Sequence, residues 1–469
     1  MRTGVETLEA ALSAIVGEAH VLTDADTRAA YERDWTGAWI GQARMVVRPG
    51  STAEVAAVLD ACRGAGAPLV PQGGNTGLVG GSVPDGSGRA VVLSTSRLRR
   101  LGPVDADAAQ VSVGAGVTLA VLAEHAAAAG FDVPVDLAAR QSATIGGMVA
   151  TNAGGLRVLR HGMMRQHVAG VEAVLGTGAV VSHLAGLAKD NTGYDLAGLL
   201  CGSEGTLGVV TEVRLRLVAS LPERVTAVVA FTGLAAARDG VRTLRRAVPG
   251  LDAAEYVVAP GARLVRSTLG VAGVFARLHP VEVVVEVAGE VDPTDELAAV
   301  VNGLPGVLEV AVATPADGSG RRAALWEIRE RHTEALARVG PPRKYDVSVP
   351  LATLPVFVDE VVARVAGWPE SDGAVCHHFG HLGDGNVHLN VLGLEGIADH
   401  ALERLDGLIL GLVAAHGGSI SAEHGIGRLK RRWLHLSRQP DELAAFAAVK
   451  QALDPDGLLN PGVLLPDRP

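Results

Sequence analysis

Two short segments in the last quarter of the chain carry side chains that could bind a metal ion and remove a proton. In GHLGDGNVHLN, His381 and His388 are separated by six residues that include an Asp-Gly pair. Such a composition favours a turn between two extended runs, which would return both imidazoles toward one point. In SAEHGIGRLK, Glu423 offers a third, harder ligand, and His424 beside it offers a base. A His/His/carboxylate set leaves one coordination position open, as in catalytic rather than structural zinc sites.

Other interpretations of these residues stay open at this stage. A histidine in an alternating strand such as Val387–Leu389 is more often structural than functional, and His377 and His378 stand close enough to be the ligands instead. A zinc hydrolase without flavin would use the same set, with His424 as its base. A non-catalytic binding module is a third alternative. The ligand set also accepts several metals, so its spacing does not identify the ion.

A glycine-rich segment near the amino terminus indicates a place where phosphates could be held. PQGGNTGLVGGS, residues 71–82, follows a helix expected over Ser51–Arg63 and an extended piece at Pro68–Val70. The next expected element, Arg89–Ser94, is a strand. Because no helix follows the GGNTGLVGG spacing, the segment does not fit a Rossmann fingerprint. Its glycines could still let successive backbone N–H groups face phosphate oxygens.

Two further segments are rich in small residues. Residues 141–162 place glycine, serine, threonine and asparagine densely between apolar residues, as a backbone that packs flat against a large planar ligand would require. Residues 201–217 begin in the same way and end in an alternating run that predicts a strand. An ordinary glycine-rich surface loop remains the alternative for each segment taken alone.

Length, composition and charge limit the classes of protein. The chain has 469 residues, which predicts two or more domains. Its net charge of −10 argues against a nucleic-acid binder. Few lysines beside many alanines, valines, leucines and arginines are typical of a GC-rich bacterial genome. The amino terminus indicates an amphipathic helix rather than a signal peptide, and no apolar run approaches the ~20 residues of a spanning helix. Peripheral membrane contact stays open.

The cysteines argue against a metal cluster. Cys62, Cys201 and Cys376 are the only three in the chain, and no two form a CxxC pair. We therefore expect them to be reduced and buried, as in a cytoplasmic protein.

Taken together, the three glycine-rich segments resemble the FAD-binding domain of the vanillyl-alcohol-oxidase/p-cresol-methylhydroxylase flavoprotein superfamily. ALWEIRERHTEAL (324–336), RKYDVSVP (343–350), GHLGDGNVHLNV, SAEHGIGRLK and ALDPDGLLNPGVLLP resemble its D-2-hydroxyacid dehydrogenase group, most closely the D-2-hydroxyglutarate dehydrogenase branch. The resemblance implies an α+β fold with a two-subdomain FAD-binding domain over 1–218. It also implies a substrate and metal domain over 219–420, with an antiparallel sheet covered by helices, and a helical segment over 421–469 that returns to the flavin.

The resemblance also assigns binding residues. His381, His388 and Glu423 would hold a divalent metal, usually zinc. FAD would be dissociable, because Asn75 and Thr76 stand where relatives with covalent flavin commonly have a histidine. The residues implied to contact FAD are Pro71, Gly73, Gly74, Asn75, Thr76, Gly77, Leu78, Ser82, Asp136, Ser142, Ile145, Gly146, Gly147, Thr151, Asn152, Gly154, Gly155, Arg157, Glu204, Gly205, Val209, Val210 and Asn460.

These groups fit the oxidation of an alcohol beside a carboxylate. That reaction needs loss of the hydroxyl proton and transfer of a hydride to an acceptor such as flavin N5. A divalent ion would acidify the hydroxyl and fix its geometry, and His424, if neutral, would take the proton. The electron acceptor, for example an electron-transfer flavoprotein or a quinone, is not identified by the sequence. Oxidase activity with oxygen and assembly as a homodimer also stay open.

The choice of substrate depends on polar side chains. In the D-2-hydroxyglutarate branch, positions matching Arg329, Thr333 and Lys344 hold a substrate carboxylate, and Asn390 is expected to add a polar contact. The spacing of Arg329 and Thr333 places both on one face of a helix expected over 324–336. The alternative is that Arg329 pairs with a glutamate of the same helix. Lys344 favours a dicarboxylate such as D-2-hydroxyglutarate over D-lactate or other D-2-hydroxyacids.

Overall fold

The computed structural model describes the backbone of residues 2–466 and the side chains of residues 8–466. The chain divides into two compact units. Unit 1 contains the chain up to Gly155, Gly162–Ser220, and the chain from Glu423 onward. Unit 2 contains Leu221–Ala422 together with the short segment Leu156–His161. Unit 1 is therefore assembled from both ends of the sequence.

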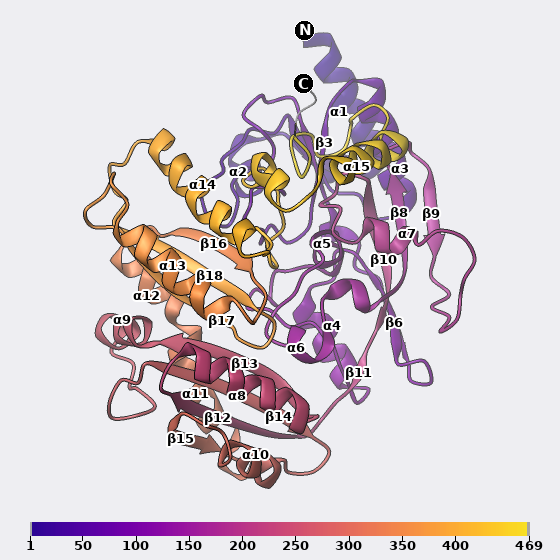
Figure 1. The fold of residues 1–469 in the computed structure, drawn as a ribbon. Coiled ribbons are helices and arrows are strands. Elements are labelled where there is room, and N and C mark those ends of the chain that lie inside the picture. The colour runs from indigo at the N-terminus through magenta and orange to yellow at the C-terminus, as the bar shows by residue number, and fades with distance from the viewer. Residues whose placement is uncertain (1, 467–469) are drawn as a thin grey trace. The chain divides into compact units, whose positions relative to one another are not determined.

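Unit 1 contains two principal sheets (Figure 1). In the first, ordered β1-β2-β4-β3, the last three strands are parallel. The second, ordered β5-β6-β10-β8-β9, is antiparallel, and β7 pairs with β11 alone. The strands are β1 Val21–Leu22, β2 Met45–Val47, β3 Leu69–Gln72, β4 Val91–Ser94, β5 Leu101–Asp105, β6 Gln110–Gly114, β7 Phe131–Asp132, β8 Val168–Leu175, β9 Val180–His183, β10 Gly208–Arg216 and β11 Val218–Ala219. The two sheets correspond to the two expected subdomains.

Four helices of unit 1, at Arg2–Val16, Thr52–Gly64, Leu119–Ala127 and Ile145–Thr151, contribute to an apolar core that contains residues from both sheets. The helices at Leu196–Leu200 and Pro440–Leu453 pack in a smaller cluster with β8. The helix expected after Ser51 is confirmed, and its capping residue accepts a hydrogen bond from the Glu54 backbone N–H. The strand expected at Arg89–Ser94 is also confirmed. The helices are α1 Arg2–Val16, α2 Ala25–Glu32, α3 Thr52–Gly64, α4 Leu119–Ala127, α5 Ile145–Thr151, α7 Leu196–Leu200 and α15 Pro440–Leu453.

The carboxyl-terminal segment completes unit 1 rather than forming a separate layer. Leu459 bridges to Leu69 in parallel fashion, and the Asn460 N–H donates to the Leu69 carbonyl at 2.8 Å. The Asn460 side-chain amide also donates to the carbonyl oxygens of Gly81 and Glu204. The end of the sequence is thus fastened to the strand that leads into the first glycine-rich segment.

Unit 2 is built on a seven-stranded antiparallel sheet with the order β15-β12-β14-β13-β17-β18-β16. Its strands are β12 Glu223–Phe231, β13 Leu251–Val258, β14 Val281–Gly289, β15 Val307–Ala313, β16 Arg343–Ser348, β17 Val375–His381 and β18 Asn386–Leu392. Helices cover the sheet, and α8 and α13 lie in front of it in Figure 1. The helices are α6 Val158–His161, α8 Leu234–Ala247, α9 Ala259–Leu269, α10 Thr294–Val301, α11 Gly318–Glu330, α12 His332–Val339, α13 Leu354–Ala366 and α14 Asp399–Ala415.

One expected helix of unit 2 is wrong in its extent. The ALWEIRERHTEAL segment contains two helices, α11 and α12, separated at Arg331. Arg329 is buried whereas Thr333 is exposed, so the two side chains do not share the single helical face that their spacing predicted. A four-residue spacing places side chains together only while the helix continues without interruption.

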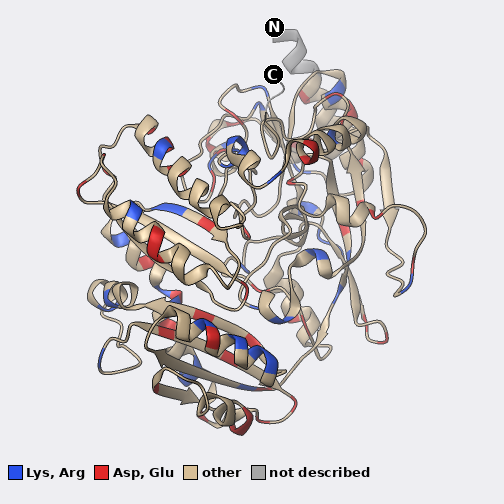
Figure 2. Ribbon diagram, in the orientation of Figure 1, with Lys and Arg blue, Asp and Glu red and all other residues tan. Residues whose placement is uncertain are grey.

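Acidic and basic residues are interspersed along both units in Figure 2. None of the described helices is long and apolar enough to cross a bilayer. The three cysteines are buried and unpaired, as the sequence predicted.

Candidate active site

One face of the unit 2 sheet gathers the polar residues that the sequence singled out. The turn predicted from the Asp-Gly pair joins β17 to β18, and His381 pairs with Asn386 at its base. Cross-strand partners point to the same side of a sheet, as do residues two apart on one strand. By this rule, Glu255 on β13 faces the same side as its partner His381. We call this side of β13, β17, β18 and β16 the polar face.

The two histidines of the predicted metal site meet on the polar face. Their Nε2 atoms are 3.2 Å apart. Two nitrogen ligands of a tetrahedral zinc ion, each at 2.0–2.1 Å, would be separated by about 3.3 Å, so the observed spacing fits a shared cation. His381 Nδ1 lies 2.5 Å from Glu255 Oε1, and His388 Nδ1 lies 3.6 Å from Asp346 Oδ1.

The carboxylate behind the His381 ring fixes which of its nitrogens carries the proton. Glu255 Oε1 can only accept a hydrogen bond, so Nδ1 of a neutral His381 ring carries the proton and Nε2 keeps its lone pair. Asp346 Oδ1 lies near the His388 ring but beyond hydrogen-bond distance. A carboxylate or carbonyl in this position is usual for metal-binding histidines. Burial raises the pKa of Glu255, but His381 and Arg329 outweigh it and hold that pKa below the ordinary value. The donor set therefore fits a divalent metal.

Arg329 reaches the polar face from α11. Its Nε and Nη2 donate to Glu255 Oε2 at 2.9 and 2.8 Å, and its guanidinium lies 4.6 Å from the centre of the Phe379 ring. The alternative interpretation expected Arg329 to pair with a glutamate of its own helix. The partner is instead Glu255, which comes from β13. Nη1 takes no part in this ion pair, so one edge of the guanidinium is left for a second anion.

The other predicted substrate residues lie in different surroundings. Asn390 is buried on the polar face, and its cross-strand partner is Lys344 on the edge strand β16. Partial desolvation lowers the pKa of Lys344. Thr333 is exposed on α12. The structure therefore brings Asn390 and Lys344 together and leaves Thr333 outside this group.

The neighbouring histidines separate into two environments. His378 is on the opposite side of β17 from His381, where its Nδ1 lies 3.2 Å from the Tyr256 hydroxyl. Burial lowers the pKa of His378 to about 4. His377 faces the polar side, but its cross-strand partner is Asn390 and not a second imidazole. His388 is thus the histidine that shares the site with His381.

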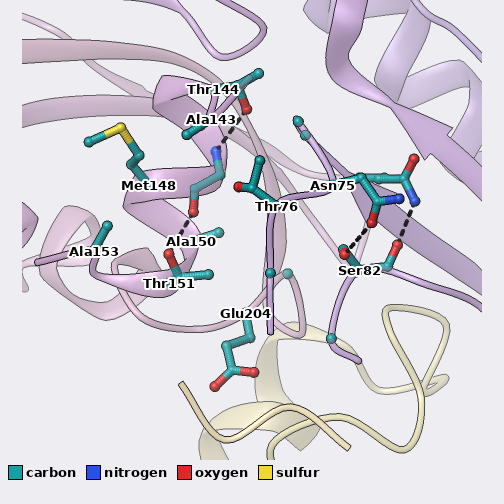
Figure 3. A pocket seen from close by; sticks show the side chains of 18 of the residues that line it. Asn75, Thr76, Ser82, Ala143, Thr144, Met148, Ala150, Thr151, Ala153 and Glu204 are labelled. Atoms are coloured by element: carbon teal, nitrogen blue, oxygen red, sulfur yellow. Dashed lines mark hydrogen bonds between the residues drawn. The ribbon is translucent and has the colours of Figure 1, made fainter. Parts of the chain in front are cut away.

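Unit 1 contains a cavity of about 320 Å³ between the glycine-rich segments. Figure 3 shows Asn75 and Ser82 on one side, Thr76 near the centre, and Ala143, Thr144, Met148, Ala150, Thr151 and Ala153 on the other side. Glu204 lies below them, with its carboxylate directed toward the C-terminal segment. Glu423 and His424 also line this cavity. The predicted third metal ligand and the predicted base therefore share a cavity with the predicted flavin residues.

The walls of the cavity are held by contacts that require small residues. Asn75 adopts a left-handed conformation at φ +53°, and its amide group donates to the Arg33 carbonyl while its Oδ1 accepts from the Ser82 hydroxyl. At Gly74, a Cβ atom would lie 1.8 Å from the Ser142 carbonyl oxygen. The two glycine-rich segments therefore contact each other through their backbones. Close backbone contact of this kind gives a wall against which a large planar cofactor can pack.

Most of the predicted flavin residues line this cavity. They are Pro71, Gly73, Gly74, Asn75, Thr76, Gly77, Leu78, Ser82, Gly146, Gly147, Thr151, Gly154, Glu204, Gly205, Val209 and Val210. Other lining residues lie within the predicted segments but were not assigned individually, namely Gln72, Val79, Gly81, Ala143, Thr144, Met148, Ala150, Ala153 and Gly208. The sequence analysis missed Thr95, Leu137, Ala138 and Ala139, which line the cavity from outside the three glycine-rich segments.

The remaining predicted flavin residues lie behind the cavity wall or outside it. Ile145 is fully buried in the core, and Asn152 ends α5 and accepts from the Arg165 N–H. Asp136 pairs with Arg140. Ser142, Gly155 and Asn460 make packing or backbone contacts, and Arg157 belongs to the short segment of unit 2.

Glu204 connects the cavity to the segment that carries Glu423 and His424. Its two carboxylate oxygens each accept a backbone N–H at 2.7 Å, one from Ile426 and one from Gly427. Burial raises the pKa of Glu204, and the two N–H groups oppose that change. His424 Nε2 lies 3.5 Å from Glu423 Oε1. Glu204 thus fixes the loop immediately after the predicted base.

Comparisons with known proteins match this arrangement. Residues 43–183 match the family described as "FAD binding domain", and residues 221–464 match "FAD linked oxidases, C-terminal domain". The chain belongs to the FAD-linked oxidase family. This flavoenzyme is 39% identical over 464 residues to the mitochondrial D-2-hydroxyglutarate dehydrogenase of Bos taurus, covering 97% of the chain and 83% of the relative. It is 38% identical over 451 residues to the D-2-hydroxyglutarate dehydrogenase of Xanthomonas citri pv. viticola, covering 92% of each.

Solved structures support the fold of the flavoenzyme. It is similar to 4-ethylphenol oxidase from Gulosibacter chungangensis, with a TM-score of 0.74, 18% identity, and coverage of 100% of this chain and 98% of the other. It is also similar to p-cresol methylhydroxylase, with a TM-score of 0.71, 14% identity, and coverage of 98% and 97%. These likenesses show the fold, and the family matches and the relatives confirm that the chain is an FAD-dependent oxidoreductase.

Proposed function

We propose that this flavoenzyme oxidises a D-2-hydroxyacid, D-2-hydroxyglutarate in the first instance, to the corresponding 2-oxoacid with the help of a divalent metal. One observation carries the proposal. Glu423 and His424, predicted as metal ligand and general base, line the same cavity as the predicted flavin residues. A base beside a flavin is what the oxidation of an alcohol needs.

The residues divide the reaction between them. Bound FAD would supply the acceptor for the hydride. His424 would accept the proton of the substrate hydroxyl at a ring nitrogen, a contribution typically worth about 10²–10⁴ in rate. Glu204 would keep the loop that follows His424 in place through its bonds to Ile426 and Gly427.

The metal would be held by His381, His388 and Glu423, and zinc is our first choice. When bound, it would stabilise negative charge on the substrate. The facing Nε2 atoms and the carboxylates behind both rings support this site. The Ala422 N–H donates to the backbone carbonyl of Asp346, the residue beside His388. Glu423 is the next residue along the chain after Ala422.

The side chains of the polar face favour a dicarboxylate. Asn390 and Lys344 are cross-strand partners, and Arg329 keeps one guanidinium edge outside its ion pair with Glu255. Arginine suits a bidentate grip on a carboxylate, and lysine adds a point charge. The relatives from Bos taurus and Xanthomonas citri are named for D-2-hydroxyglutarate, which agrees with this choice. D-lactate and other D-2-hydroxyacids are the alternatives.

Anaerobic reduction of bound flavin by a panel of D- and L-2-hydroxyacids tests the proposal. We expect D-2-hydroxyglutarate to bleach the flavin fastest, D-lactate to do so more slowly, and a chelator to slow both. A preference for L-acids, or equal rates before and after removal of metal, would contradict the proposal. Peroxide yield in air would then separate an oxidase from a dehydrogenase.

His424→Asn tests the base. We expect this variant to retain FAD and metal but to lose about 10²–10⁴ in kcat, because no group at that position can accept the proton. His435→Asn, which changes an exposed histidine of the same C-terminal segment, is the matched control. Wild-type turnover in His424→Asn would eliminate the assignment.

Three further parts of the proposal concern the surroundings of the enzyme. The buried, unpaired cysteines support a reducing location such as the cytoplasm. An electron-transfer flavoprotein or a quinone is the proposed acceptor. A homodimer is the proposed assembly, and light scattering would measure it directly.

A further inference from the structure

Glu255 occupies a position that the proposed reaction does not by itself explain. It lies near the middle of β13 and is fully buried. A buried carboxylate costs several kcal/mol unless cations or donors surround it, so its two partners matter. Oε1 lies 2.5 Å from His381 Nδ1, and Oε2 accepts from Arg329 Nε and Nη2. Each oxygen thus serves a different partner.

The two partners belong to different tasks of the proposed site. His381 is a proposed metal ligand, and Arg329 is a proposed holder of a substrate carboxylate. We propose that Glu255 is a positioning residue that couples metal binding to substrate-carboxylate recognition, one oxygen fixing the His381 ring and the other fixing the Arg329 guanidinium. This inference rests on the proposed function, and it adds a residue that touches neither the metal nor the substrate.

The hydrogen-bonding rules make the coupling specific. Because Oε1 accepts the Nδ1 proton, the neutral His381 ring keeps its Nε2 lone pair for a metal. Because Arg329 is always a donor, Oε2 can hold it in one orientation, with Nη1 outside the ion pair. A single carboxylate can satisfy both demands because both of its oxygens are acceptors.

A glutamine at this position cannot satisfy both partners. Its amide has one oxygen and one NH₂ group, and the guanidinium, which has no acceptor, will take the oxygen. The NH₂ group then faces His381 Nδ1, which must become the acceptor, and the ring proton moves to Nε2. A protonated Nε2 cannot bind a metal without losing that proton. Glu255→Gln is therefore expected to weaken metal binding while the fold is kept.

The test measures metal affinity directly. Wild-type, Glu255→Gln and Glu255→Asp proteins are stripped of metal with a chelator and titrated with Zn²⁺ against a chromophoric competitor. We expect about 10- to 100-fold weaker binding in Glu255→Gln, the range typical for loss of a carboxylate behind a ligating histidine. Glu282→Gln is the matched control, because Glu282 is a buried carboxyl of the same sheet beside another histidine, His279. Retained FAD and unchanged circular dichroism confirm that each variant is folded.

A double variant distinguishes a tautomer effect from general damage. In Glu255→Gln/Arg329→Met the guanidinium is gone, so the glutamine oxygen can turn to His381 Nδ1 and restore its proton. We expect Zn²⁺ affinity to recover to within about tenfold of wild type, while the KM for D-2-hydroxyglutarate stays raised. A structural role alone would make the double variant bind Zn²⁺ no better than the single one.

The outcomes separate this inference from the proposed function. Wild-type Zn²⁺ affinity in Glu255→Gln, or no recovery in the double variant, would overturn the role of Glu255 and leave the proposed reaction standing. Wild-type protein that binds no divalent metal would overturn the metal site itself, and this inference with it. Should Glu255→Gln not fold, Glu255→Asp answers the question. Its shorter side chain cannot reach both partners, so wild-type Zn²⁺ affinity together with a wild-type KM in that variant would equally refute the coupling.

Discussion

Gly74 gives a direct test of the cavity in unit 1. In Gly74→Ala the new Cβ would lie 1.8 Å from the Ser142 carbonyl oxygen and 2.6 Å from the carbonyl carbon. An ordinary contact begins near 3.4 Å, so the segments must separate by about 1.6 Å. Both contacting groups are backbone, and no change of rotamer relieves the clash. Overpacking of this kind costs about 1–3 kcal/mol, which corresponds to about 5- to 150-fold in FAD affinity.

The measurement separates cofactor binding from folding. Apoprotein of wild type and Gly74→Ala is titrated with FAD, followed by flavin or protein fluorescence, and the unfolding midpoint of each apoprotein is recorded. Gly86→Ala is the control, because its Cβ would meet nothing within 4 Å and its backbone is not left-handed. We expect only Gly74→Ala to lose affinity or apoprotein stability. Wild-type values for both would refute the view that backbone contact between residues 74 and 142 shapes the cavity.

Three other predictions follow from single contacts. Glu204→Gln leaves one of the N–H groups of Ile426 and Gly427 without an acceptor, which loosens the loop that follows His424. We expect kcat to fall about 5- to 150-fold with FAD retained, and an unchanged kcat would contradict this role. Lys344→Met removes the positive charge proposed to bind the second carboxylate of D-2-hydroxyglutarate. The KM for this substrate should rise about tenfold, while the KM for D-lactate should not change. Equal effects on both substrates would exclude a role of Lys344 in selecting a dicarboxylate. Burial lowers the pKa of His378 from 6.5 to about 4, so between these pH values the unfolded chain binds a proton that the folded protein does not. The free energy of unfolding should therefore fall by at most about 3.4 kcal/mol as the pH falls from 6.5 to 4. His378→Asn should reduce this fall in urea unfolding, and an unaltered pH dependence would refute the prediction.

Local chemistry explains which parts of the site could be predicted from the sequence. The turn between His381 and His388 was predictable because the Asp-Gly pair favours it, and Gly385 has φ +87° there. The glycine-rich walls were predictable because close backbone contact, as at Gly74, excludes other residues. The helix at Ser51 followed from its capping residue. In each case the determining residues lie within one short segment.

Pairing across the fold explains what the sequence could not predict. Glu255 lies 74 residues from Arg329 and 126 from His381, in a strand whose residues form no motif. Asp346 was visible in RKYDVSVP, but its place behind His388 depends on the register of β16 against β18. The sequence predicted Arg329 and Thr333 on one face of a single helix. The helix instead breaks at Arg331, and the break separates the two side chains. Long-range register and helix breaks are tertiary properties that local patterns do not encode.

The bond from the Asn460 side chain to the Gly81 carbonyl, across 379 residues of sequence, has a consequence for biosynthesis. A ribosome that adds about 5–20 residues per second needs about 20–80 seconds to make that stretch. During this time the loop that contains Gly81 has been synthesised but its partner segment, which contains Asn460, has not. Nearly all of unit 2, by contrast, is a single continuous stretch of sequence, Leu221–Ala422. We therefore expect unit 2 to be able to collapse before unit 1 is complete, and the cavity of unit 1 to be completed only after the C-terminal segment has been made.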